Sequence, residues 1–179
     1  MRPTLVRPPV MEPRMRSHPV EETAQLKIVE RRPGALWALV PLLGILSAGG
    51  FDGGLSFVTD PTGASLGAKL TWLDRTPVSD FRLPGLFLLV VYGIGALAVI
   101  AGLMMKSSPG PLARLDRILG YHWSWAGSIA LGAGLVLWIA YELVVMPETT
   151  FLQPALIVIG LLIAGIPFLP SMRRWYAHA

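Results

Sequence analysis

Four long apolar blocks, separated by short polar segments, dominate the pattern of this chain. They cover residues 36–57, 83–105, 124–146 and 152–169. A helix needs about 20 predominantly apolar residues to cross the hydrocarbon core of a bilayer. The pattern therefore predicts an all-α membrane protein, a four-transmembrane-helix bundle that occupies residues 34–170.

The polar segment between the first two blocks, residues 51–85, has the most distinctive local motifs. A turn is expected at Asp60, because proline and glycine follow it within three residues. We predict that residues 65–74 form a short extracytoplasmic helix at the membrane interface, with Trp72 at the edge of its leucine face. Thr76, followed by proline, is expected to cap the start of the next helix.

Basic residues are distributed unevenly between the polar segments. Residues 1–33 form a basic, proline-rich cytoplasmic tail that buries too little apolar surface to fold alone. We expect this tail to be retained, because it lacks the apolar core and cleavage site of a signal peptide. The tail, the 106–120 link and the C-terminal residues 171–179 hold twelve basic residues, whereas the opposite loops hold only Lys69, Arg75 and Arg82. The positive-inside rule then predicts that both termini are cytoplasmic.

Composition narrows the class of protein further. The chain is 53% apolar and 15% charged, with a mean hydropathy of +0.57. It contains no cysteine, which excludes disulfides, thiol catalysis and thiolate metal sites. The basic residues are not interleaved with aromatic residues as a nucleic-acid groove requires, so no nucleic-acid partner is expected. The dominance of arginine among the basic residues is typical of high-GC bacteria, so we expect a multi-pass protein of the bacterial inner (plasma) membrane.

Glu142 is the leading candidate for a functional side chain inside a predicted span. Ionisable residues in spans are rare and usually face protein or water. Glu142 lies beside Tyr141 and one turn after Trp138, and the alternative is a structural role at the outer interface or an ion pair with Arg82. Asp52 is a second candidate, and with Glu142 it would form a carboxylate pair for a cation or a proton. If the first helix ends at Gly49, Asp52 lies in water instead.

The remaining polar candidates have simpler explanations. Asp60, Asp74 and Asp80, with Arg82 nearby, lie in the outer loop, and turn or capping roles account for them better than a calcium loop does. His122 is an alternative axial ligand for a haem or chlorin, but no second histidine lies at a matching depth. We therefore predict no metal, no cofactor and no catalytic residue.

Two short motifs resemble a group of small four-helix bacterial membrane proteins without an assigned activity. They are GG-x5-DPTG at residues 53–63 and TPVSDFRLPG at residues 76–85. In size and topology the chain also looks loosely similar to DoxX-type membrane proteins. The resemblance covers residues 35–169 and implies the topology, but it implies no catalytic residue.

Two functional hypotheses follow. Small residues recur at a spacing of four, as in Gly160 and Ala164, which favours close helix packing. The first hypothesis is a non-enzymatic accessory or scaffolding subunit of a larger inner-membrane complex, with membrane lipid and other membrane-protein subunits as partners. The second is a small proton- or ion-coupled transporter or membrane enzyme that uses Glu142 and Asp52.

Overall fold

The computed structural model describes residues 32–146 and 150–177, and within these ranges the chain is helical with no β-strand. The predicted tail, residues 1–33, therefore falls almost entirely outside the described residues. Three helices are long and apolar enough to cross a membrane: Gly34–Thr59, Arg82–Met105 and Trp123–Val145. A fourth span is complete only if Leu152–Phe168 and Pro170–Tyr176, which are bent by 63°, count as one.

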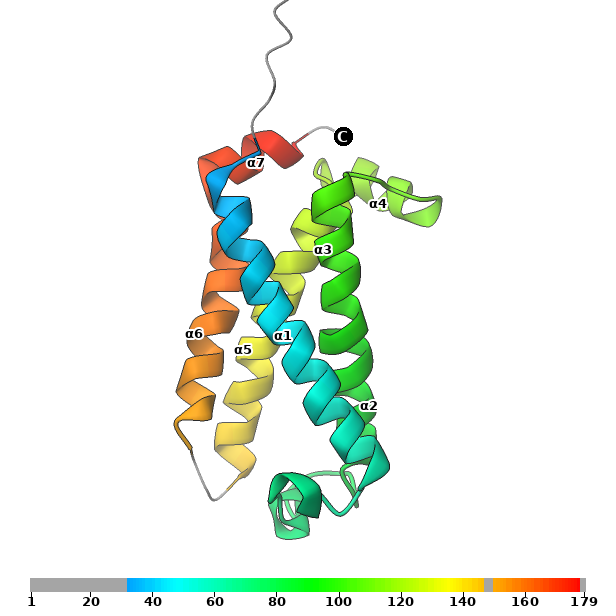
Figure 1. Ribbon diagram of the computed structural model, residues 1–179, viewed down its shortest axis with the longest axis vertical. Coiled ribbons are helices and arrows are strands. Elements are labelled where there is room, and N and C mark those ends of the chain that lie inside the picture. The colour runs from blue at the N-terminus through cyan, green and yellow to red at the C-terminus, as the bar shows by residue number, and fades with distance from the viewer. Residues whose placement is uncertain (1–31, 147–149, 178–179) are drawn as a thin grey trace, which may run out of the picture. The chain divides into compact units, whose positions relative to one another are not determined.

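The first long helix, α1 (Gly34–Thr59), runs without a break through the glycine-rich stretch that follows Gly49. The helix therefore does not end at Gly49, and Asp52 is a helical residue. Pro41 lies within the helix. Figure 1 shows α1 crossing from one end of the bundle to the other.

The outer segment differs from the prediction of one helix over residues 65–74. Two short 3₁₀ turns stand there, η1 (Ala64–Leu66) and η2 (Leu70–Leu73). Gly67 separates them with φ = 69°, a left-handed conformation that ends a helix and that glycine adopts without strain. The turns fold over a small apolar cluster, in which the Phe57 and Phe81 rings stack 4.7 Å apart.

The predicted helix cap at Thr76 was also wrong. The Thr76 hydroxyl donates backwards to the Leu73 carbonyl at 2.9 Å, which closes a turn and starts no helix. The next helix, α2 (Arg82–Phe87), begins six residues later. Asp80 caps its start instead, because one carboxylate oxygen accepts from the Arg82 backbone N–H at 3.0 Å.

The second span contains a π-helical segment that the sequence pattern did not predict. α2 leads into the π-helix η3 (Leu88–Ile94), which continues as α3 (Gly95–Met105). Within a span, displaced backbone groups must find partners inside the protein. The buried Ser47 hydroxyl of α1 supplies one, since it donates to the Gly93 carbonyl at 2.8 Å.

The second half of the chain follows the predicted blocks up to its last turns. The polar link contains α4 (Pro111–Leu119), and α5 (Trp123–Val145) is the third long helix. α6 (Leu152–Gly165) ends in the 3₁₀ turn η4 (Ile166–Phe168), and α7 (Pro170–Tyr176) turns away from it. Residues predicted as a C-terminal segment thus form a helix over the end of the bundle (Figure 1).

Glycines set the closest contacts between helices. A Cβ atom on Gly54 would lie 2.6 Å from the Leu89 backbone nitrogen, and one on Gly50 would lie 2.7 Å from the Tyr92 carbonyl carbon. α1 and η3 are therefore packed backbone to backbone. α5 and α6 meet in the same way, because a Cβ on Gly132 would lie 3.0 Å from the Ala164 Cα.

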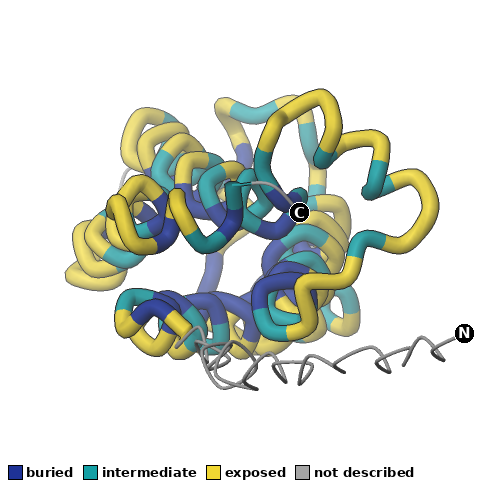
Figure 2. Tube along the Cα trace, turned by 90° about the horizontal axis from the view of Figure 1, so that it is seen from above, coloured by how far each residue is buried: buried dark blue, intermediate teal, exposed yellow. Residues whose placement is uncertain are grey.

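The buried positions face the middle of the bundle and the exposed positions face outwards (Figure 2). Large apolar side chains occur in both sets. Leu43 is fully buried, whereas Ile45, two residues further along α1, is 57% exposed. An apolar exterior of this kind is what the hydrocarbon of a membrane would contact.

Candidate functional site

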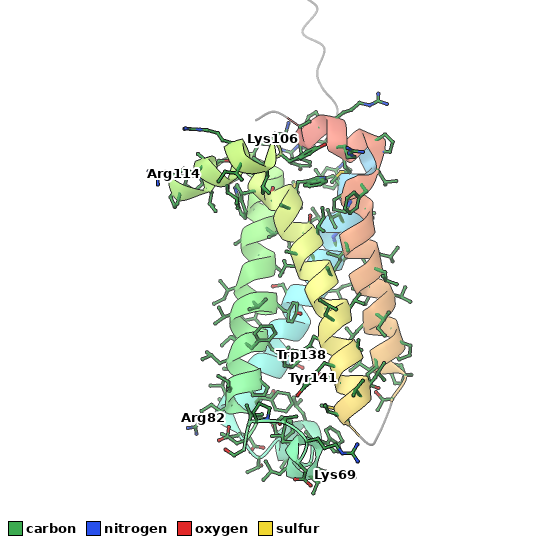
Figure 3. The ribbon with its side chains drawn as sticks, turned by 180° about the vertical axis from the view of Figure 1, so that it is seen from behind. Lys69, Arg82, Lys106, Arg114, Trp138 and Tyr141 are labelled. Atoms are coloured by element: carbon green, nitrogen blue, oxygen red, sulfur yellow. The ribbon has the colours of Figure 1, made fainter. Side chains whose placement is uncertain are left out.

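Glu142 lies in the last turns of α5 and is held by its own helix. The Trp138 indole N–H donates to Glu142 Oε1 at 2.6 Å. The two side chains are half-buried and four residues apart, so they stand one above the other on one face of the helix. Figure 3 shows Trp138 near the middle of that half of the bundle, with Tyr141 below it.

Aromatic side chains surround this hydrogen bond. The Trp138 ring stacks on Phe87 at 4.9 Å, and Phe87 meets the buried Tyr92 ring edge-on at 5.6 Å. A Cβ on Gly134 would lie 3.4 Å from the Tyr92 hydroxyl oxygen. Gly134, Trp138 and Glu142 therefore form a stripe on α5 that faces the end of α2 and the π-helix η3.

The other two members of the predicted intramembrane set lie elsewhere. Asp52 is exposed on α1, a helix whose principal neighbours are α2, η3 and α3 rather than α5. Tyr141 is exposed beside Glu142 in the sequence but points from a different face of α5. Among the described contacts, neither residue bonds to Glu142. The partner of Glu142 is Trp138 rather than Arg82.

Asp60 organises the outer turn. One of its carboxylate oxygens accepts from the Thr62 hydroxyl at 2.6 Å and from the Thr62 N–H at 3.1 Å, while the other accepts from the Ser65 N–H at 2.8 Å. Hydrogen bonds to a carboxylate favour its charged form. The Thr62 hydroxyl, followed by the Ser65 N–H, accordingly lowers the pKa of Asp60 below its ordinary value.

The remaining loop candidates do not assemble into one site. Asp80 caps α2, as described above, while Asp74 and Arg82 are exposed. Over residues 32–146 and 150–177, no three histidine, aspartate or glutamate side chains are grouped so that they could hold a metal ion.

His122 is buried where α5 begins. It is only 1% exposed, and its Nδ1 lies 2.7 Å from the Ser124 hydroxyl and accepts from the Ser124 N–H at 3.3 Å. The other ring nitrogen, Nε2, is buried and has no hydrogen-bond partner among the described residues. Burial disfavours the charged imidazolium and lowers the pKa of His122, although the carboxylate of Asp116 opposes this effect.

No family model, no curated protein and no solved structure matches the chain.

Sequence reasoning missed a second polar region at the end of α3. Tyr176 of α7 is buried there, and its hydroxyl donates to the Leu103 carbonyl at 2.7 Å. Arg32 donates to the neighbouring Met104 carbonyl at 3.2 Å. The Lys106 ammonium lies 3.9 Å from the centroid of the Trp175 ring. The two hydrogen bonds join residues that are 72 and 73 positions apart, and only the cluster of aromatic and basic residues in α7 offered a local signal.

Proposed function

We propose that this chain is a multi-pass protein of the bacterial plasma membrane that serves as a non-enzymatic accessory or scaffolding subunit of a larger membrane assembly. Three apolar helices of spanning length, with the bent α6–α7 pair as a fourth, support the four-helix transmembrane architecture. The short 3₁₀ turns η1 and η2 would then lie at the extracytoplasmic interface.

The distribution of charge supports an orientation with both termini in the cytoplasm. One end of the bundle carries the start of α1, the end of α3, α4 and α7 (Figure 1). The described basic residues at this end are Arg32, Lys106, Arg114, Arg117, Arg173 and Arg174. The opposite end carries Lys69, Arg75 and Arg82. The positive-inside rule assigns the more basic end to the cytoplasm.

The observation that best supports the accessory role is that Glu142 is hydrogen-bonded within its own helix. A carboxylate inside a span suggests function by default, because its burial is costly. Here the Trp138 N–H, one turn earlier on the same helix, stabilises the carboxylate at 2.6 Å. Backbone contacts at Gly54 and Gly132 pack the neighbouring helices closely. A fixed helical body of this kind is suited to supporting partner subunits.

The direct test is to recover the chain from its native membrane by mild detergent extraction after chemical cross-linking. We expect it to migrate with at least one partner in fixed stoichiometry. Val158 on α6 and Ile45 on α1 are both more than half exposed, so Val158→Trp and Ile45→Trp probe two different outer faces without altering the core. If one of these faces binds a partner, the variant on that face should no longer migrate with the partner. The unfolding midpoint of the isolated variant should stay unchanged. Migration as a single chain from cross-linked membranes would contradict the accessory role.

A second candidate function is proton or ion coupling at Glu142. The supporting observation is its place opposite a π-helix that carries the buried Tyr92, since π-helical segments are frequent at functional sites. Proteoliposomes that report ion or proton flux would test this role. Flux that disappears in Glu142→Gln, but persists in a variant of an exposed loop carboxylate such as Asp74→Asn, would favour coupling over the accessory role.

A further inference from the structure

Three segments of the chain meet at the end of α3. The Arg32 guanidinium donates to the Met104 carbonyl at 3.2 Å, so the residue that precedes α1 is held against the last turn of α3. Tyr176 donates to the Leu103 carbonyl at 2.7 Å and brings α7 to the same turn. The Lys106 ammonium lies 5.6 Å from the centroid of the Tyr176 ring. Two cations therefore flank one tyrosine.

The conformation of the chain places Lys106 over this point. Lys106 ends α3 in the left-handed conformation, with φ = 49°, which is uncommon for a residue other than glycine. Its ammonium group stacks on the Trp175 ring at 3.9 Å. A cation–π contact of this kind fixes the position of the side chain and keeps its charge. Arg32 and Lys106 are both exposed, so their charges are accessible from outside.

Further basic residues lie near this junction. Arg173 and Arg174 follow on α7, and Arg173 donates to the Tyr121 hydroxyl at 3.2 Å. The acidic residue described at this end is Asp116, whose carboxylate is engaged by the Trp123 N–H at the start of α5. Among the described residues, basic side chains thus outnumber acidic ones at the α3–α7 junction, which favours an anion.

Large apolar side chains are exposed on the same two helices, within a turn or so of these cations along the chain. Trp37 is 59% exposed one turn into α1, and Met105 is 68% exposed in the last turn of α3. A phospholipid has the matching profile, with a phosphate at the surface and acyl chains beneath it. A soluble phosphate would use the cations but not the apolar side chains.

We propose that Arg32 and Lys106 form a binding site for the phosphate of an anionic phospholipid, whose acyl chains lie along Trp37 and Met105. Trp175 positions Lys106, and Arg32 is positioned by the α3 carbonyl. Basic sites of this kind, at the cytoplasmic ends of transmembrane helices, suit anionic headgroups. The inference rests on the membrane location and is independent of the accessory role.

The test measures lipid binding to the purified full-length chain in an uncharged detergent. Native mass spectrometry follows the fraction that carries one phosphatidylglycerol molecule during a titration. The double variant Arg32→Gln/Lys106→Gln should bind about thirty-fold more weakly, since each basic residue near an anionic surface contributes roughly 1 kcal/mol. Phosphatidylcholine, which has no net charge, should bind weakly to both forms.

The matched control is Arg114→Gln/Arg117→Gln on α4. It removes the same charge from the same end of the bundle, and Figure 3 shows Arg114 pointing away from the α3–α7 junction. The site predicts a change of less than about three-fold in this control. Equal losses in the two double variants would overturn the proposal in favour of diffuse surface charge. Displacement of phosphatidylglycerol by inorganic phosphate at millimolar concentration would overturn the lipid assignment.

A folding control keeps the test decisive. The unfolding midpoint of each variant is measured in the same detergent. If the double variant is destabilised, Arg32→Gln alone replaces it, because this exposed side chain precedes α1 and leaves Lys106 on Trp175. A roughly five-fold loss is expected for the single variant, and no loss would refute the site.

Discussion

The packing of α1 on η3 makes a sharp prediction for two adjacent glycines. An alanine Cβ at position 54 would lie 2.6 Å from the Leu89 backbone nitrogen, about 0.8 Å closer than the 3.4 Å at which ordinary contact begins. Backbone cannot rotate away as a side chain can, so the two helices must separate. Overpacking of this kind costs about 1–3 kcal/mol. Gly54→Ala should therefore lower the free energy of unfolding by about that amount.

Gly53→Ala is the matched control for this prediction. Its Cβ would meet only the Leu88 Cδ1 at 3.7 Å, which is ordinary van der Waals contact. Both substitutions gain the same helix propensity, at most about 1 kcal/mol, so this gain cancels in the comparison. Titration with a denaturing detergent, followed by tryptophan fluorescence, gives both free energies. A difference below about 0.5 kcal/mol between the two variants would refute the backbone-to-backbone contact.

Three further predictions concern topology, Glu142 and His122. Ser65→Cys should react with an impermeant thiol reagent in intact cells and Ser107→Cys should not, and the reverse pattern would invert the proposed orientation. Trp138→Phe should cost about 1–3 kcal/mol of stability because it leaves the Glu142 carboxylate without its donor, whereas Glu142→Gln, which keeps an acceptor, should cost less than about 1 kcal/mol. Burial lowers the pKa of His122 in the folded state. Below about pH 6.5, the ordinary pKa of histidine, the unfolded state therefore binds a proton at this side chain more readily than the folded state does. Stability should therefore fall as the pH drops below about 6.5 and stay constant above about pH 7.5, and His122→Asn should remove this component of the pH profile.

The correct sequence predictions all came from residues that are close together in the chain. The apolar blocks predicted the long helices. The turn at Asp60 followed from residues within five positions of it. Where the same reasoning failed, one backbone conformation decided the outcome. The leucines of residues 65–74 have helical spacing, but the left-handed Gly67 divides them into two turns.

Contacts between distant segments could not be predicted in the same way. His122 and Ser124 are close in sequence, so their hydrogen bond was open to prediction. The burial of His122 could not be predicted, because it depends on the distant helix α7. This helix folds back so that the His122 N–H donates to the Tyr176 carbonyl at 3.0 Å. The π-helix η3 likewise lacks a local signal, since the residues that accompany it, Gly50 and Ser47, belong to α1.

The buried face of each helix could not be predicted because lipid is as apolar as the interior of the bundle. In a soluble protein a polar outer face would mark the orientation of each helix, but here Leu43 and Ile45 are equally apolar although only Ile45 is exposed. Small residues mark only the places where two helices approach backbone to backbone. Even this signal is ambiguous in the sequence, since Gly53 and Gly54 are adjacent and only Gly54 lies against the backbone of η3. The spans could therefore be predicted from composition, whereas their faces, and with them the neighbours of Glu142 and Asp52, required the structure.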